Sequence, residues 1–451
     1  MTSMTQTAEA ARPAIRPRIA AKSGLFLFLG ANAGAVTALF VEGGLSSDLL
    51  ISIGRLAGLY GALAMAFQLL LVARLPWLDR RLGMDRLTSW HRWTGFSILW
   101  LLVAHLVFIV FGYAETEQKG AVDELVELAN SMEGILRALV AFVLILVVGA
   151  ASARFARKRM AYETWHFIHL YTYAAVFLAF SHQIALGQSF VSNDIGQAYW
   201  WTLWLGAGAA VLAGRVVLPL WRNLRHQLRV TAVVSESASV VSVYISGKHL
   251  DRMPARAGQF FLWRFLTKDR WWQANPFSLS AAPDGRTLRL TAKAVGESSS
   301  ALRSLKVGTR VFAEGPYGAF TTIHQQQSNA LLIAGGVGIT PIRALLEDIA
   351  GHVIVLYRVR TEADAVLLPE LTGLARARGA VVQVLTGPDQ ANGPRGAVLG
   401  PANLNLLVPD VHDRDVFVCG PPGMTTAVLR SLRELRVPSQ QVHAERFSLA
   451  A

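Results

Sequence analysis

Six long apolar segments, all before residue 221, constrain this chain more than any other feature of its sequence. Each segment approaches or exceeds the ~20 residues that an α-helix needs to cross a hydrocarbon core of ~30 Å. They cover residues 24–41, 49–73, 89–112, 134–153, 163–186 and 198–220. The sequence therefore predicts a bundle of six transmembrane helices, which returns the chain to the side of the membrane where it began.

Charged residues alternate between the loops that join these segments. The loops after the second and fourth segments are basic, whereas those on the opposite side carry mainly Asp and Glu. Because Lys and Arg are retained on the cytoplasmic side, we expect the tail (1–22), the basic loops and everything after residue 221 to be cytoplasmic. The net charge of +13 comes from clusters at helix ends and not from one basic face, which argues against nucleic acid. We expect a multi-pass protein of a bacterial-type plasma membrane.

The chain after residue 221 has the pattern of soluble domains, with short strands, Gly/Pro turns and charged helices. Alternating runs between about 228 and 323 predict antiparallel strands and favour a small barrel. From 329 onward, strand-like and helical segments alternate, which predicts a doubly wound parallel sheet. The expected strands of that sheet are 330–334, 353–357, 381–385 and 415–419. We therefore expect three units, a membrane bundle (23–222), a barrel (223–326) and an α/β domain (327–451).

Four histidines lie inside the third and fifth apolar segments. His91 and His105 are fourteen residues apart, which places them ~40° from one helix face and ~21 Å apart along the axis. His169 and His182 lie at matching depths on the fifth segment, so two facing pairs are expected. Neutral imidazole is a strong axial haem ligand, and polar groups at this depth are costly unless they bind, pair or line a cavity. The pattern favours two bis-histidine haem sites, with hydrogen-bonded bundle histidines or a proton relay as alternatives.

Two further residues of these segments need an explanation. The thirteen residues from His169 to His182 leave an ideal helix ~140° out of register, so we expect the fifth helix to be irregular or strongly tilted. His166 is an alternative ligand, but its spacing to His182 fits no better.

Arg55, about one turn inside the outer end of the second segment, is a buried cation for which a haem propionate is a natural partner. Snorkelling of Arg55 to the interface is the alternative.

A glycine-rich loop follows the expected strand 331–334 and precedes a helix, which is the context that a dinucleotide-binding loop requires. Gly335, Gly336 and Gly338 permit close approach of the backbone to a pyrophosphate. We expect Thr340 to cap a helix that begins at Pro341. A tight turn with a purely structural role is the alternative.

Two arginines end the next strand. The guanidinium groups of Arg358 and Arg360 suit the 2′-phosphate of NADPH, whereas an NAD site favours a carboxylate for the ribose. The sequence thus favours NADPH over NADH, with solvated strand-end arginines as the alternative.

A candidate flavin site precedes the glycine loop. Gly296, Ser298 and Ser299 open a helical stretch whose N–H groups and hydroxyls suit the pyrophosphate of FAD. An earlier motif consists of Asn275, Pro276, Phe277, Ser278 and Ser280. Together with the four histidines, the segment 165–169 and the glycine loop, this motif resembles the ferric reductase and NADPH oxidase superfamily over nearly the whole chain.

The resemblance implies that the four histidines ligate two stacked b-type haems and that residues 275–280 contact the ring and ribityl chain of FAD. Cys419, Gly420 and Pro421 match the nicotinamide-side motif, which implies that the thiol lies near the hydride path; a buried inert thiol is the alternative. Because Cys419 is the only cysteine, redox chemistry needs bound cofactors. Phe447 matches the terminal aromatic that covers the flavin ring, with a core Phe as the alternative.

The expected function is transmembrane electron transfer from cytoplasmic NADPH, through FAD and two b-type haems, to oxygen or ferric iron outside. An NADH-linked ferric or quinone reductase with the same layout is one alternative. A proton-conducting membrane module with a regulatory nucleotide-binding domain is another, and it predicts no haem spectrum. The expected partners are the lipid bilayer, NADPH and an acceptor, either oxygen, a ferric chelate, a quinone or a periplasmic protein.

Ile109 and Ala175 depart from oxygen-reducing animal members of the superfamily, which carry a histidine and an aromatic at these two positions.

Overall fold

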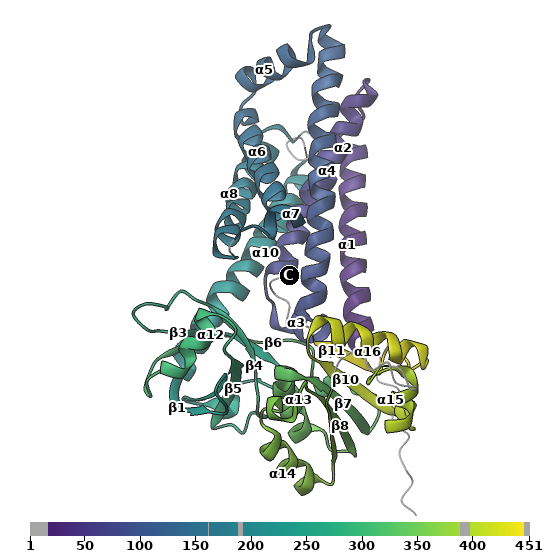
Figure 1. The fold of residues 1–451 in the computed structure, drawn as a ribbon. Coiled ribbons are helices and arrows are strands. Elements are labelled where there is room, and N and C mark those ends of the chain that lie inside the picture. The colour runs from purple at the N-terminus through teal and green to yellow at the C-terminus, as the bar shows by residue number, and fades with distance from the viewer. Residues whose placement is uncertain (1–16, 161, 188–192, 388–396, 446–451) are drawn as a thin grey trace, which may run out of the picture.

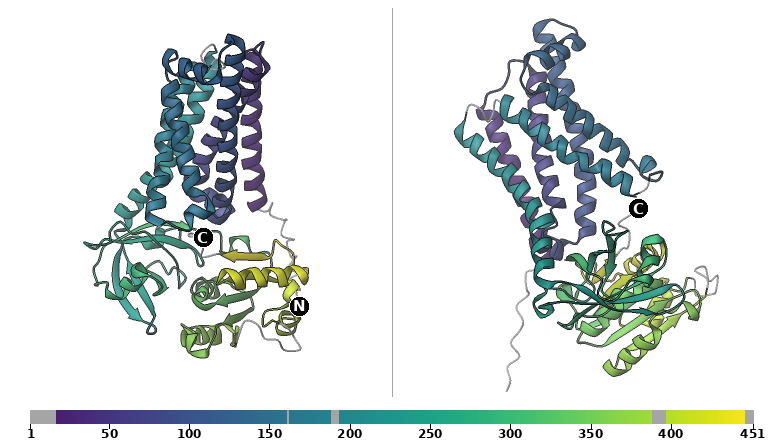
Figure 2. Two further views of the ribbon diagram at one scale, coloured as in Figure 1. Left: turned by 45° about the horizontal axis from the view of Figure 1, so that its top comes forward. Right: turned by 90° about the vertical axis from the view of Figure 1, so that its left-hand side faces the viewer.

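A tall helical bundle stands on a broader base that contains all the strands (Figure 1). The computed structural model describes residues 17–160, 162–187, 193–387 and 397–445. The bundle is built by the first half of the chain and the base by the second half, and two further views show the bundle rising from one side of the base (Figure 2). The structure thus has a helical half followed by a half that contains the described strands.

The bundle consists of long helices joined by short ones. The long helices are α1 (Pro17–Glu42), α2 (Leu49–Val72), α4 (Met84–Glu117), α6 (Ile135–Ser152), α8 (Tyr162–Leu186) and α10 (Asp194–Leu212). The short helices are α3 (Pro76–Leu82), α5 (Ala121–Ser131), α7 (Arg154–Arg157) and α11 (Leu218–His226), and a π-helical turn, η1 (Ala213–Val217), joins α10 to α11. Among the described residues, five helices are long and apolar enough to cross a membrane, and α8 is a further long helix that packs along α6. The chain is thus a multi-pass membrane protein.

Two three-stranded antiparallel sheets form the part of the base that follows the bundle. The first sheet contains β1 (Arg229–Ser235), β2 (Val240–Ser246) and β5 (Thr287–Lys293), and the second contains β4 (Asn275–Ser278), β3 (Phe260–Phe265) and β6 (Val311–Tyr317). Their inner faces share one core around Phe261 and Trp263. The antiparallel strands are confirmed, but strand pairing does not close them into one barrel, and only isolated bridges such as Leu279 to Leu290 link the sheets. One reason is that Pro276 has no N–H to donate, which suits β4 to a sheet edge.

A five-stranded parallel sheet completes the base, in the order β11-β10-β7-β8-β9. Its strands are β7 (Asn329–Gly335), β8 (Val353–Arg358), β9 (Val381–Leu385), β10 (Arg414–Cys419) and β11 (Val442–Glu445). Its helices are α13 (Ile339–Asp348), α14 (Leu368–Arg378), α15 (Pro401–Leu407) and α16 (Pro422–Glu434). Alternate residues of β7 pack on opposite faces, Leu332 against α13 and Leu331 against α15 and α16. The predicted doubly wound sheet is therefore confirmed, and β11 is a strand that the sequence pattern did not predict.

Candidate functional site

The four histidines predicted to pair are brought together at two depths of the bundle. The ring centroids of His91 on α4 and His169 on α8 are 5.9 Å apart, with an angle of 67° between the ring planes. Those of His105 on α4 and His182 on α8 are 6.4 Å apart, at 57°. His166, the alternative ligand, has its ring 6.4 Å from that of Trp165. The structure therefore pairs His91 with His169.

Both pairs have the spacing expected of two ligands on opposite sides of one metal ion. An imidazole nitrogen lies about 2 Å from a bound metal, so two such rings have centroids roughly 6 Å apart. The Nδ1 atoms of His91 and His182 are buried and have no hydrogen-bond partner among the described residues. That part of the chain also contains no group of three or more His, Cys, Asp or Glu suited to a metal. A metal that brings its own equatorial ligands, as haem iron does, fits these two-histidine sites.

Close packing of α2 against α4 orients His105. Its Nδ1 lies 2.8 Å from the carbonyl oxygen of Gly54, so the tautomer that carries its proton there leaves Nε2 free to bind a metal. A Cβ atom on Gly58 would lie 2.6 Å from this same Nδ1, so the ring needs a glycine at that position. Gly54 and Gly58 are one helical turn apart and place a smooth backbone surface beneath the ring. The outer pair thus depends on small residues that the histidine pattern alone did not reveal.

The fifth apolar segment forms one unbroken helix, α8, so the irregularity considered for it is absent. The packing gives the physical reason. α4 packs closely on α2 and α8 packs closely on α6, so the histidines reach across the space between two helix pairs. Side chains that span such a space reach each other from a wider range of helix faces than side chains at a tight contact. The ~140° offset between His169 and His182 is accommodated in this way.

Arg55 lies on α2, on the half of the bundle that contains His105. Its Nη1 donates to the carbonyl of Gly44 at 3.1 Å, and its guanidinium lies 5.6 Å from the ring of Phe40. Its Nη2 is buried without a hydrogen-bond partner in the described part of the chain. A buried guanidinium nitrogen in this position suits an anionic group such as a propionate.

The glycine loops of the parallel sheet meet where its winding reverses. β8 and β9 lie on one side of β7, and β10 and β11 lie on the other. A Cβ atom on Gly335 or on Gly420 would lie 2.5 Å from the side chain of Met424, and one on Gly338 would collide with the carbonyl of Cys419. The loops after β7 and β10 therefore touch through their backbones. Ligands of such sheets bind outside the carboxyl ends of the strands at this reversal, where the structure places both predicted nucleotide motifs.

Thr340 does not cap the nucleotide helix as we expected. α13 begins at Ile339, preceded by a single 3-10 turn over Gly336–Gly338. The Thr340 hydroxyl instead donates to the carbonyl of Val337 at 3.0 Å. The helix starts two residues before Pro341 because the 3-10 turn already directs the chain into a helical path.

The two strand-end arginines have different surroundings. Arg358 is only 7% exposed, and it donates to the carbonyls of Val359 at 2.6 Å, Leu385 at 3.1 Å and Gly387 at 2.5 Å. Arg360 is exposed. The guanidinium of Arg358 thus joins the ends of β8 and β9, and that of Arg360 faces solvent.

The flavin motif forms β4 and the turn after it. Ser278 and Ser280 are buried, and the carbonyl of Phe277 accepts a hydrogen bond of 3.0 Å from the indole of Trp263. In the second flavin motif, the hydroxyl of Ser299 accepts from the N–H groups of Val295 and Gly296. Pro276 is exposed, and Asn275 is partly buried. The side chain of Ser298 lies outside the described part of the chain.

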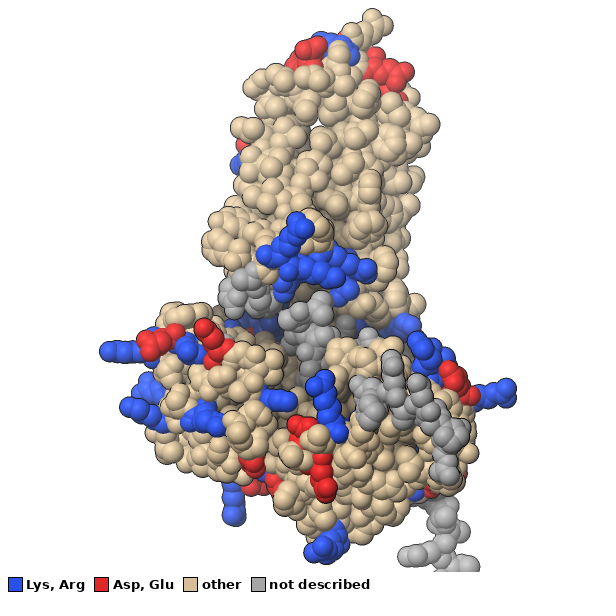
Figure 3. Space-filling view, in the orientation of Figure 1, with Lys and Arg blue, Asp and Glu red and all other residues tan. Residues whose placement is uncertain are grey.

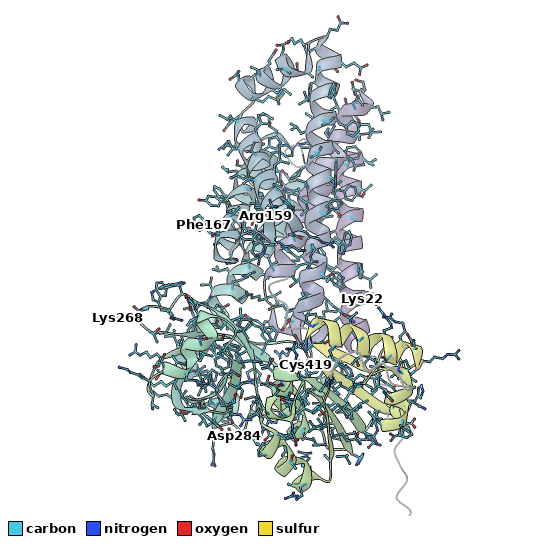
Figure 4. The ribbon with its side chains drawn as sticks, in the orientation of Figure 1. Lys22, Arg159, Phe167, Lys268, Asp284 and Cys419 are labelled. Atoms are coloured by element: carbon cyan, nitrogen blue, oxygen red, sulfur yellow. The ribbon has the colours of Figure 1, made fainter. Side chains whose placement is uncertain are left out.

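Cys419 ends β10 and is fully buried (Figure 4). Burial, with a smaller effect from the carboxylate of Glu445, raises the pKa of its thiol well above the usual value. The thiol is therefore neutral near pH 7. Phe447, the predicted terminal aromatic, lies outside the described residues.

The bundle docks on the second antiparallel sheet through β6. Glu314 of β6 is 7% exposed and forms ion pairs with Arg74, at the end of α2, at 2.5 Å and with Arg264 of β3. Asn223 of α11 exchanges two hydrogen bonds of 2.8 Å with the backbone of Ala313. These contacts hold the sheet that contains the flavin motif against the end of the bundle.

Two family models match separate parts of the chain. The ferric reductase like transmembrane component matches residues 57–180, and the oxidoreductase NAD-binding domain matches residues 332–430. Ferredoxin–NADP reductase B of Sorangium cellulosum is 31% identical over an alignment of 193 residues, and the match covers 38% of this chain and 77% of that protein. By its second half the chain belongs with the ferredoxin–NADP reductases, and its transmembrane part is similar to ferric reductases. Its second half is a ferredoxin-reductase-type module for flavin and nicotinamide nucleotide, and the protein is an NAD(P)H oxidoreductase.

A flavohemoprotein of Pseudomonas putida is 32% identical over an alignment of 243 residues; the match covers 51% of this chain, and the chain spans 61% of the length of that relative. Among solved structures, the flavohem-like FAD/NAD binding domain of nitric oxide dioxygenase from Vibrio cholerae O1 biovar El Tor shares 25% identity, with a TM-score of 0.40. The structural match covers 49% of this chain and 98% of that domain.

Proposed function

We propose that this chain oxidises NADPH on the cytoplasmic side of a bacterial plasma membrane. It delivers the electrons, through FAD and two b-type haems, to oxygen or ferric iron on the outer side. The observation that carries this proposal is the two facing histidine pairs of the bundle, whose ring centroids are 5.9 and 6.4 Å apart. This bundle is docked on a reductase module. A proton relay needs neither this spacing nor such a module.

The charge distribution supports the orientation. Lys and Arg gather around the end of the bundle that faces the base, whereas Asp and Glu gather at the far end (Figure 3). The basic helix α7 with Lys158 and Arg159 contributes to the first group, and Asp123 and Glu124 of α5 contribute to the second. Because basic residues stay on the cytoplasmic side, this distribution favours a base in the cytoplasm and a far end outside.

Each part of the module has its own task in this proposal. The backbone of the loop at Gly335–Gly338 holds the nucleotide pyrophosphate, and the start of α13 adds a favourable dipole. Arg360 reads the 2′-phosphate, and Ser278 and the backbone of β4 hold the flavin ring. When bound, FAD would supply the exchange between the two-electron chemistry of NADPH and the one-electron chemistry of haem iron. The neutral, buried thiol of Cys419 excludes water beside the nicotinamide.

An NADH-linked reductase is the second candidate, and the surroundings of Arg358 favour it. Because this guanidinium is already bonded to three backbone carbonyls, only Arg360 is left to select the 2′-phosphate. The two candidates differ in nucleotide preference and agree on the route through the bundle.

The decisive experiment is anaerobic reduction of the purified protein by NADPH or NADH in detergent, followed by optical spectra. We expect two low-spin haems per chain, both reduced by NADPH through the flavin, and then reoxidised when oxygen or a ferric chelate is added. A protein without a haem spectrum would overturn the proposal in favour of the proton-conducting alternative.

A further inference from the structure

Two buried arginines meet at the end of the flavin motif. Arg289 of β5 and Arg343 of α13 are 5% and 6% exposed. Arg289 donates through Nη2 to the carbonyl of Ser280 at 2.6 Å, and Arg343 donates through Nη1 to the same oxygen at 3.2 Å. Arg289 also donates through Nε to the Ser280 hydroxyl at 3.0 Å. Ser280 lies two positions after the last residue of β4, so both arginines bind the chain just beyond the end of the flavin strand.

Carboxylates from the nucleotide-binding domain neutralise these charges. An oxygen of Glu370, on α14, lies 2.9 Å from Arg289 Nη1 and 2.5 Å from Arg343 Nη2. Glu347, on α13, lies 2.6 Å from Arg343 Nη1 and accepts the N–H of Ala282 at 2.5 Å. Two positive and two negative groups are thus joined across the boundary between the antiparallel sheets and the parallel sheet. We call Arg289, Arg343, Glu347 and Glu370 the interdomain clamp.

The clamp connects the helix that follows the nucleotide loop to the turn that follows the flavin strand. Arg343 lies four residues after Ile339, the first residue of α13, and therefore one turn above the nucleotide loop on the same helix. Ser280 lies two residues after Ser278, the last residue of the flavin strand. Few rotatable bonds separate either end of the clamp from its site. The two arginines are buried, whereas the side chains of Glu347 and Glu370 are 26% and 36% exposed. Burying a charge in such a pair is costly and contributes little net stability, which favours a role in positioning over a role in folding alone.

We propose that the interdomain clamp sets the position of the nicotinamide relative to the flavin, with Arg343 and Glu370 as positioning residues for hydride transfer. This inference rests on the proposed function. In the step concerned, NADPH gives up a hydride with its electron pair and becomes NADP⁺, and the flavin takes up both electrons and the hydrogen. Because a displacement of 1 Å can cost about a hundredfold in rate, a loosened clamp slows this step while the glycine loop still binds the nucleotide.

The test is anaerobic stopped-flow reduction of the flavin by NADPH in the full-length protein, with Glu370→Gln, Arg343→Met and Arg343→Lys. We expect the limiting rate of flavin reduction to fall about tenfold or more in the first two variants. The Kd for NADPH should change less than about threefold, and the long-wavelength absorbance of the stacked nicotinamide and flavin should weaken. Arg343→Lys keeps the charge and should restore part of the rate.

Arg414→Met is the matched control. Arg414 is 4% exposed and pairs with Asp410 at 2.7 Å inside the parallel-sheet domain, so its loss should lower the Tm without slowing hydride transfer. If Arg343→Met does not retain flavin, Glu347→Gln carries the same test, because this carboxylate pairs with Arg343 and its side chain is 26% exposed.

Limiting rates equal to wild type in variants that bind flavin would overturn the proposal. So would a weaker NADPH affinity at an unchanged limiting rate, because the clamp would then serve binding. A wild-type protein whose flavin NADPH does not reduce would contradict the proposed function instead.

Discussion

Buried histidines and arginines of the bundle and buried arginines of the module beneath it differ in their hydrogen-bond partners. In the described part of the bundle, Nδ1 of His91 and of His182 and Nη2 of Arg55 have no hydrogen-bond partner. In the module, buried Arg289 and Arg414 donate to carboxylates and carbonyls of the same chain. Unpaired polar groups cost most at membrane depth, where no water replaces the missing partner. Buried side-chain atoms without such a partner also occur in the module, at Thr321, Arg343 and Gln441. We propose that the two histidines and Arg55 of the bundle serve a bound cofactor, whereas Arg289 and Arg414 already have their partners within the protein.

The strongest test of this difference removes one ligand of the outer pair. We expect His105→Ala and His182→Ala each to abolish one haem completely and to keep the other, because each site has two protein ligands. Haem content per chain, measured as the pyridine complex, and the low-spin optical spectrum give the result.

His166→Ala is the control on the same helix, and it should keep both haems. Retention of two haems in both His105→Ala and His182→Ala would show that these polar groups are not cofactor ligands, and the distinction between the two regions would fail.

Glu314→Gln sharpens the comparison at the boundary between the regions. Removing this carboxylate leaves Arg74 and Arg264 without their shared partner, which should destabilise the docked arrangement by about 3 to 5 kcal/mol. We expect haem reduction by NADPH to slow, while reduction of the flavin keeps its rate. Thermal unfolding and stopped-flow traces of the two cofactors separate these effects.

Glu127→Gln, in the exposed pair with Lys119 at the far end of the bundle, serves as the control. Solvent screens an exposed ion pair, so the loss of this pair should change neither rate. Equal haem reduction in Glu314→Gln and in the control would mean that β6 docking does not govern electron passage.

The smallest expected effect separates the two strand-end arginines of the module. Arg358→Ala should lower stability by about 1 to 3 kcal/mol, because three carbonyls lose their donor. Arg360→Ala should leave stability unchanged and reduce the preference for NADPH over NADH by about 1.5 to 3 kcal/mol, or roughly ten- to hundredfold in kcat/KM. Steady-state kinetics with both nucleotides and the Tm of each variant give the comparison. A change of preference in Arg358→Ala alone would reverse the two roles.

Much of the architecture was predictable because it follows from local properties of the chain. The expected strand 381–385 matches β9, and the other three expected strands of the parallel sheet differ from β7, β8 and β10 by one or two residues. A buried parallel strand is a continuous apolar run, and the turns that follow it need glycine, so both are readable over a few residues. The start of α13 was misplaced because the 3-10 turn before it has no distinct sequence signal.

The sequence by itself determined the membrane bundle, the order of the domains and the identity of the chemical groups, since segment length, periodicity and residue type are local. Only the tertiary structure decided which partner each buried group has. Arg74 meets Glu314 across 240 positions of the chain, and Arg289 meets Glu370 across 81. His169 and His182 reach α4 although their spacing on one helix places them on different faces. Electrostatic and hydrogen-bond energies depend on separation in space, which an apolar pattern along the chain does not specify.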